Sequence, residues 1–210
     1  MACQICEIRK PKRFCPGVSA DICTQCCGKE REETIHCPAG CVYLIEGRRH
    51  ERPRPIDPLT FPNPDIRVSE AFIEQNEEIF TLVAVSLIQG VLKTPNAVDN
   101  DIRECLDSVI KTYRTTDSGL IYETKPVNRI AADIQQRLTE SIAEFQKFVL
   151  ERTGTQSIKD GDILSVFVFL QRLELSSNNG RRYGRAFLDS LRNTFPIQPA
   201  EQAAPPSIIV

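Results

Sequence analysis

Eight of the nine cysteines of this chain lie within its first 41 residues. They form three closely spaced pairs and two single residues: Cys3/Cys6, Cys23/Cys26 and Cys37/Cys41, with Cys15 and Cys27. A spacing of two to four residues lets two cysteine thiolates reach one tetrahedral ion. Cysteines that only fill a core have no reason to gather in this way, so the cluster indicates either disulfides or metal ligation.

The start of the sequence favours metal over disulfides. Disulfide-rich scaffolds belong to secreted proteins, whose export signal contains an apolar run of about seven residues or more. Here the first residues are followed at once by charged ones: Glu7, Arg9, Lys10 and Lys12. We therefore expect a cytoplasmic protein whose thiols stay reduced and bind metal.

Eight thiolates predict two closed four-cysteine zinc sites, and closed sites are structural because they leave no position for a substrate. The adjacent residues Cys26 and Cys27 do not easily face one ion. We therefore expect two neighbouring sites, with Cys26 in one and Cys27 in the other or the reverse. One partition assigns Cys3, Cys6, Cys23 and Cys26 to the first ion and Cys15, Cys27, Cys37 and Cys41 to the second. An interleaved partition fits the spacing equally well. Replacement of a cysteine by His36 is the weaker alternative, because Cys37 follows it directly.

An iron–sulfur cluster is the alternative cofactor, since four thiolates also hold such clusters. The sequence lacks the C-x2-C-x2-C-x3-C run of bacterial ferredoxins. Zinc is therefore the favoured metal, with two Zn²⁺ ions per chain.

The distribution of charge bears on nucleic-acid binding. Residues 1–54 carry ten lysines and arginines and seven acidic residues, a formal charge of +3, whereas residues 55–210 carry −5. Eight bound thiolates and two Zn²⁺ ions together contribute −4, which brings the loaded cysteine-rich segment to about −1. An arginine-rich stretch, Arg48–Arg54, could contact phosphate, but the overall charge disfavours nucleic acid as a partner.

Beyond the cysteines the sequence predicts a linker and a helical domain. We expect a cysteine-rich zinc-binding module at 1–46, a Pro/Arg-rich linker at 47–64, a helical domain at 65–196 and a disordered tail at 197–210. No apolar stretch is long enough for a membrane helix. The predicted fold class is mainly α, with a small zinc-binding module followed by an all-α helical bundle.

Apolar residues at helical spacing predict five helices in this domain. The first begins at Asp65 or Ser69 and continues without interruption to Val91. The others cover about 98–113, 127–152 and 163–175, followed by a last helix around Phe187 to Leu191. The fourth is rich in β-branched and aromatic residues, but its spacing favours helix over strand. Cys105 falls on an apolar stripe and is interpreted as a core residue.

Two stretches resemble an uncharacterised bacterial family with an amino-terminal cysteine-rich segment. They are Cys15-Pro16 through Cys23-Thr-Gln-Cys26-Cys27-Gly28 to Cys37-Pro-Ala-Gly-Cys41, and Phe169-Leu-Gln-Arg-Leu173 through Asn178-Asn-Gly-Arg-Arg182 to Arg185-Ala-Phe-Leu-Asp189. Gly119-Leu-Ile-Tyr-Glu123 lies between them. The resemblance implies a metal-binding module joined to a helical domain and implies no activity.

The sequence favours a non-enzymatic protein. Its two histidines, His36 and His50, lie in the cysteine-rich module and the linker, and phosphate-binding glycine loops are absent. One loop stands out because it combines glycines with three arginines, Arg181, Arg182 and Arg185, which are candidates for contacting an anion or an acidic partner. We therefore predict a zinc-binding adaptor with a protein partner and an unassigned oligomeric state. A nucleic-acid-associated regulator and an iron–sulfur redox protein are the alternatives.

Overall fold

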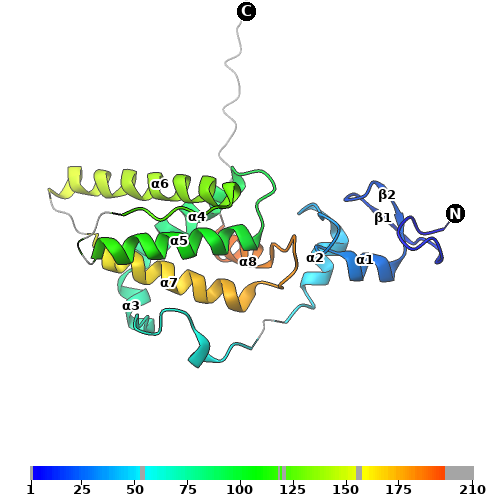
Figure 1. The fold of residues 1–210 in the computed structure, drawn as a ribbon, viewed down its shortest axis with the longest axis horizontal. Coiled ribbons are helices and arrows are strands. Elements are labelled where there is room, and N and C mark those ends of the chain that lie inside the picture. The colour runs from blue at the N-terminus through cyan, green and yellow to red at the C-terminus, as the bar shows by residue number, and fades with distance from the viewer. Residues whose placement is uncertain (1, 53–54, 118, 120–121, 155–157, 197–210) are drawn as a thin grey trace, which may run out of the picture.

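The cysteine-rich segment folds around a short hairpin in the computed structural model, which describes residues 2–52, 55–117, 119, 122–154 and 158–196. Strand β1 (Arg13–Cys15) pairs antiparallel with β2 (Ala20–Ile22), and Cys15 lies opposite Ala20. Helices α1 (Thr24–Glu30) and α2 (Val42–Arg48) follow. We call this unit the cysteine module; it forms one end of the molecule in Figure 1.

The rest of the described chain is helical, as the sequence predicts. It contains the 3₁₀ turn η1 (Pro58–Thr60) and helices α3 (Glu70–Gln75), α4 (Glu77–Leu92), α5 (Asp99–Asp117), α6 (Arg129–Thr153), α7 (Asp160–Ser177) and α8 (Ala186–Thr194). Helix α4 packs against α6, α7 and α8, while α5 packs against α6 and α7. The prediction of a mainly α protein with a cysteine-rich region before a helical body is confirmed.

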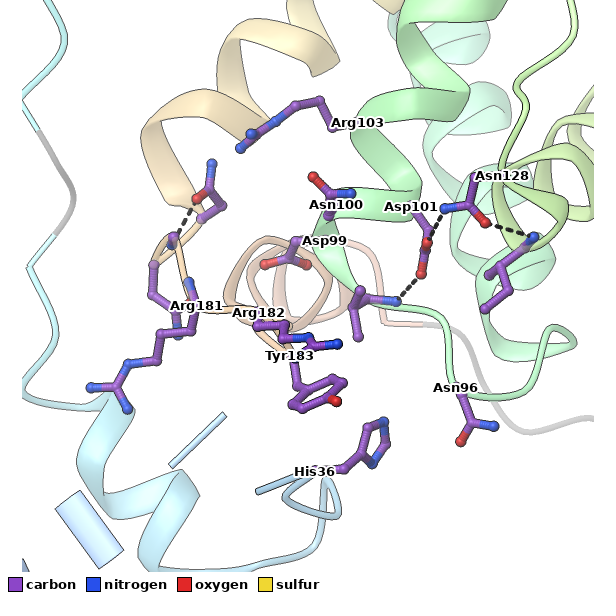
Figure 2. Close-up of a pocket in the computed structure, with 15 residues that line it drawn as sticks. His36, Asn96, Asp99, Asn100, Asp101, Arg103, Asn128, Arg181, Arg182 and Tyr183 are labelled. Atoms are coloured by element: carbon purple, nitrogen blue, oxygen red, sulfur yellow. Dashed lines mark hydrogen bonds between the residues drawn. The ribbon is translucent and has the colours of Figure 1, made fainter. Parts of the chain in front are cut away.

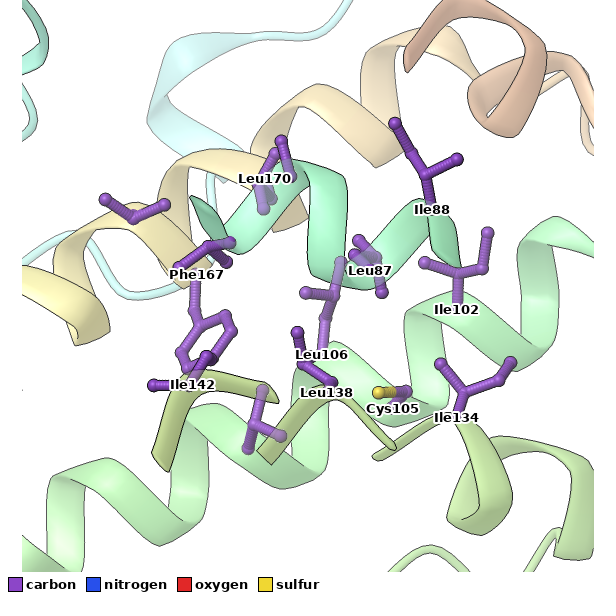
Figure 3. Close-up of a cluster of buried hydrophobic side chains, with 14 of the residues drawn as sticks. Leu87, Ile88, Ile102, Cys105, Leu106, Ile134, Leu138, Ile142, Phe167 and Leu170 are labelled. Atoms are coloured by element: carbon purple, nitrogen blue, oxygen red, sulfur yellow. The ribbon is translucent and has the colours of Figure 1, made fainter. Parts of the chain in front are cut away.

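The core of this helical body consists of large aliphatic and aromatic side chains from four helices. Leu87, Leu106, Leu138 and Phe167 are almost fully buried, and Figure 3 shows them converging between the helices. Cys105 lies among them, is fully buried, and burial raises the pKa of its thiol to about 12. Its assignment to the core is therefore confirmed.

The structure divides the predicted first helix in two. Ser69 caps α3 through a hydrogen bond to the Phe72 N–H, but the helix ends at Asn76, where φ is −118° and ψ is 27°. The backbone N–H of Asn76 donates to the carbonyls of Phe72 and Ile73, and its side chain also donates to the Phe72 carbonyl. Because an asparagine does not disturb the apolar spacing on either side, periodicity alone missed this break.

Other expectations have mixed outcomes. The stretch at 163–170 is helical, with Asp160 and Asp162 in the first turn of α7. The domain boundaries stay predictions, although α2 extends to Arg48 and so enters the predicted linker. Arg54 and the predicted tail at 197–210 lie outside the described residues. Within the described part, no helix has the length and apolar character that crossing a membrane requires.

Asp99, the first residue of α5, binds the start of α8 through two hydrogen bonds. Its two carboxylate oxygens accept hydrogen bonds from the backbone N–H groups of Phe187 and Leu188, at 2.9 and 3.1 Å. Burial raises the pKa of Asp99 to about 7, the nearby Glu174 adds to this, and the two N–H groups and Arg48 oppose it.

This raised pKa predicts a pH dependence of stability. Because the folded protein holds the Asp99 proton more tightly than the unfolded chain does, its contribution is full below about pH 4 and is lost as pH rises through about 7. We expect the carboxyl carbon of Asp99 to titrate near pH 7 in an NMR experiment. The Asp99→Asn variant should show less loss of unfolding free energy between pH 4 and 7 than the parent protein; an Asp99 signal that titrates near pH 4 would contradict this.

Candidate metal centre

Four cysteines of the module bring their sulfur atoms together. The sulfurs of Cys3, Cys6, Cys23 and Cys26, which we call the first cysteine group, all lie within 4.8 Å of one another. For sulfurs about 2.3 Å from a tetrahedral zinc ion, the expected separation is about 3.8 Å. The donor set and its spacing therefore fit a tetrahedral ion held by four thiolates, and this group is compatible with metal binding.

The hairpin and α1 place these cysteines. The Gln4 N–H donates to the Asp21 carbonyl at 3.1 Å, which holds the turn with Cys3 and Cys6 beside the end of β2. Cys23 is the N-cap of α1 and its sulfur accepts from the Cys26 N–H at 3.4 Å. The helix start thus directs both members of the second pair toward the first pair.

The surroundings of the first cysteine group favour the thiolate form of Cys3 and disfavour that of Cys26. Burial raises the pKa of Cys3, but backbone N–H groups, including that of Cys23 at 3.2 Å, outweigh it and lower the pKa to about 6. Burial and the neighbouring thiols raise the pKa of Cys26 to about 12. The Arg9 guanidinium approaches the sulfurs of Cys6 and Cys23 at 3.9 and 3.8 Å. Four sulfurs this close cannot all ionise without a cation, and a divalent metal supplies that charge.

The remaining four cysteines of the module form a looser second set. Cys15, Cys27, Cys37 and Cys41, which we call the second cysteine group, line one cavity of about 10 Å³. Among the described residues, however, the first cysteine group is the one set of potential ligands whose atoms all lie within 4.8 Å of one another. The structure therefore assembles the first group of one of the two partitions that the spacing allowed, and the other four cysteines line a common cavity.

The partition follows from the geometry of α1. Cys26 and Cys27 are successive helical residues, so their side chains point about 100° apart. Cys26 joins the first cysteine group, whereas Cys27 faces the cavity of the second. The Cys27 sulfur is approached by the guanidinium groups of Arg13 and Arg31 at 3.5 and 3.9 Å. Burial raises the pKa of the Cys37 thiol, although the Glu32 N–H lowers it.

His36 lies outside both cysteine groups. Its ring packs edge-on against Tyr183 of the helical body, with ring centroids 5.5 Å apart. Its Nε2 atom is buried and has no hydrogen-bond partner among the described residues. The ring is thus placed at the junction between the cysteine module and the helical body.

Two of the three predicted anion-contact residues are occupied by the cysteine module itself. Arg181 donates to the Arg31 carbonyl and Arg185 donates to the Cys37 carbonyl. Arg182 instead lies over the Tyr183 ring at 5.3 Å. The arginine-rich loop at 178–185 therefore binds the backbone of the cysteine module through two arginine side chains.

Sequence reasoning missed the acidic residue at the centre of this junction. Glu32 is fully buried, its carboxylate accepts from Arg48 and from Asn179, and its carbonyl accepts from the Tyr183 N–H at 2.7 Å. Arg48 also pairs with Asp189 of α8. Glu32 has φ 55°, which costs a non-glycine residue about 1 kcal/mol that these contacts offset.

These contacts also change the interpretation of the arginine-rich stretch. Arg48 was a candidate phosphate contact, but only 13% of its side chain is exposed and its guanidinium is engaged by Glu32 and Asp189. Arg181 and Arg185 donate to backbone carbonyls. Three of the arginines that were candidate phosphate contacts of a nucleic-acid-binding protein therefore already have partners within this chain. Arg49, by contrast, is exposed and pairs with Glu46 on the surface of α2.

The sequence matches no protein-family model and no curated protein, and no solved structure matches the chain. The resemblance to an uncharacterised bacterial family is therefore not supported by these comparisons and stays a prediction.

Proposed function

We propose that this protein is a non-enzymatic adaptor whose amino-terminal module is held by structural zinc. The observation that carries the proposal is the assembly of four cysteine sulfurs within 4.8 Å of one another. Four protein ligands complete the shell of a tetrahedral zinc ion and leave no position for a substrate. Such an ion acts as a cross-link between the Cys3–Cys6 turn and the start of α1.

The proposal includes a second zinc ion on the second cysteine group. Its support is the common cavity that these four cysteines line and the partition of Cys26 and Cys27 between the two groups. Zinc is preferred over an iron–sulfur cluster because the ferredoxin spacing is absent from the sequence.

The adaptor role is inferred from what the module leaves exposed. Ile8, Phe14 and Val18 are 84%, 59% and 40% exposed, although each is a large apolar side chain. Large apolar side chains at a surface mark protein–protein contacts when they gather. We propose that a protein partner covers these side chains, while the helical body serves as the scaffold.

The metal content of the intact protein tests the proposal. Native mass spectrometry and elemental analysis of freshly purified protein should give two zinc ions per chain. One zinc ion, lost in a Cys6→Ser variant and retained in a Cys41→Ser variant, would limit the proposal to the first cysteine group. Iron with visible absorbance, or metal-free protein with sulfurs linked to each other, would overturn it.

A further inference from the structure

A large polar pocket lies where the cysteine module meets the helical body. Its volume is about 820 Å³, within the range of small-molecule sites. Its walls come from four parts of the chain: the loop before α2, the start of α5, the turn before α6 and the arginine-rich loop after α7. Figure 2 shows His36, Tyr183 and Arg182 along one side and Asp99, Asn100 and Arg103 along the other.

The acidic groups of this pocket are already occupied. Asp99 accepts two backbone hydrogen bonds from the start of α8. Asp101 accepts from the Val98 N–H at 2.9 Å and from the Asn128 side chain at 2.6 Å. Each of the two carboxylates therefore accepts two hydrogen bonds that hold the pocket walls in place.

Two arginines of the pocket keep donor groups that the described residues do not use. Arg103 uses Nε and Nη2 to bind the buried Glu174, at 2.9 and 3.0 Å, and its Nη1 makes no hydrogen bond with the described residues. Within the same described part of the chain, Arg182 makes no hydrogen bond or ion pair, and it rests on the Tyr183 ring. Both side chains line the pocket and offer it N–H groups and positive charge.

We propose that this pocket is a binding site for a small acidic molecule that carries a carboxylate or a phosphate. Arg182 and the third nitrogen of Arg103 supply charge-assisted hydrogen bonds to the anionic group. The exposed amides of Asn96 and Asn100 lie at the rim to orient the rest of the ligand. Because one wall belongs to the cysteine module, the ligand also connects the module to the helical body.

This inference is independent of which metal the cysteines hold. It depends on the module lying against the arginine-rich loop, which is secured by the contacts of Glu32. A failure of ligand binding in protein of full metal content would count against the pocket alone, whereas a failure of the zinc proposal would appear in the metal content. The two proposals are therefore tested separately.

The test is titration of the full-length, metal-loaded protein with three probes: inorganic phosphate, adenosine monophosphate and citrate. Isothermal titration calorimetry and amide chemical shifts should show saturable binding of at least one probe with a Kd of about 1 mM or tighter. The shifts should appear at His36, Asn100 and the arginine-rich loop. The preferred probe distinguishes a phosphate ligand from a carboxylate ligand.

One variant and one matched control complete the test. Arg182→Gln should weaken binding about tenfold or more, the value of one charge-assisted hydrogen bond. Arg152→Gln is the control, because Arg152 likewise lies over an aromatic ring, Phe148, but outside this pocket. No saturable binding by any probe at about 10 mM, or equal affinity of the Arg182 and Arg152 variants, would overturn the proposal.

Discussion

Removal of metal from the full-length protein by a strong chelator is expected to unfold the cysteine module and leave α4 to α8 folded. The module has two three-residue strands, and its buried core contains cysteines with only Ile22, Ile35 and Leu44 as aliphatic members. A unit of this size does not bury enough apolar surface to fold without a cross-link. Structural zinc in comparable small modules contributes about 10 kcal/mol or more.

Hydrogen exchange measured by mass spectrometry provides the readout. Amide protection should fall to unfolded levels for residues 2–45 and stay high in the helices that enclose Leu87 and Leu106. The Cys26→Ser variant should reproduce the effect, because it removes one thiolate from the first cysteine group. The Cys105→Ala variant is the control: it also removes a buried thiol, but from the helical core, and should keep its full metal content. Protection of the module that survives complete metal removal would contradict the prediction.

The elements that could be predicted from sequence are those whose cause is local. Helices α5, α6 and α7 follow from apolar residues at helical spacing, and α6 ends at Gly154, which adopts the left-handed conformation with φ 69°. The two C-x2-C pairs of the first cysteine group follow from their spacing, since each pair is itself a turn that aims two sulfurs at one point, whereas spacing alone left open which pairs share an ion. Such features need only a few neighbouring residues, so the sequence displays them directly.

The junction between module and helical body could not be predicted in this way. Glu32 belongs to the charged run Lys29-Glu-Arg-Glu-Glu33, which is typical of a solvated surface. It is buried because Arg48, Asn179 and Tyr183 surround it, and the last two are about 150 residues away in the chain. Contacts over such separations leave no periodic signal, and the same reason hides the pocket beside His36.

Loss of the negative charge at Glu32 is the second large effect that we expect. In Glu32→Gln, the Arg48 guanidinium keeps Asp189 but loses its buried partner, while the new amide presents N–H groups toward Arg48 or Asn179. Removing one member of a buried ion pair typically costs about 3–5 kcal/mol. This free-energy loss should weaken the attachment of the module to the helical body, because Arg48 and Asn179, the two partners of the Glu32 carboxylate, lie at that junction.

The matched control is Glu46→Gln, which breaks the pair between Glu46 and Arg49 on the surface of α2. Both side chains are well exposed, at 62% and 72%, so this change should alter stability by less than about 0.5 kcal/mol. Urea unfolding followed by hydrogen exchange should show the large loss for Glu32→Gln alone, with protection lost first around Tyr183. Metal content should stay the same in both variants, which separates loss of attachment from loss of the metal centre. Equal stability of the two variants would mean that the Glu32 contacts do not hold the module in place, and the pocket beside His36 would then lack a fixed wall.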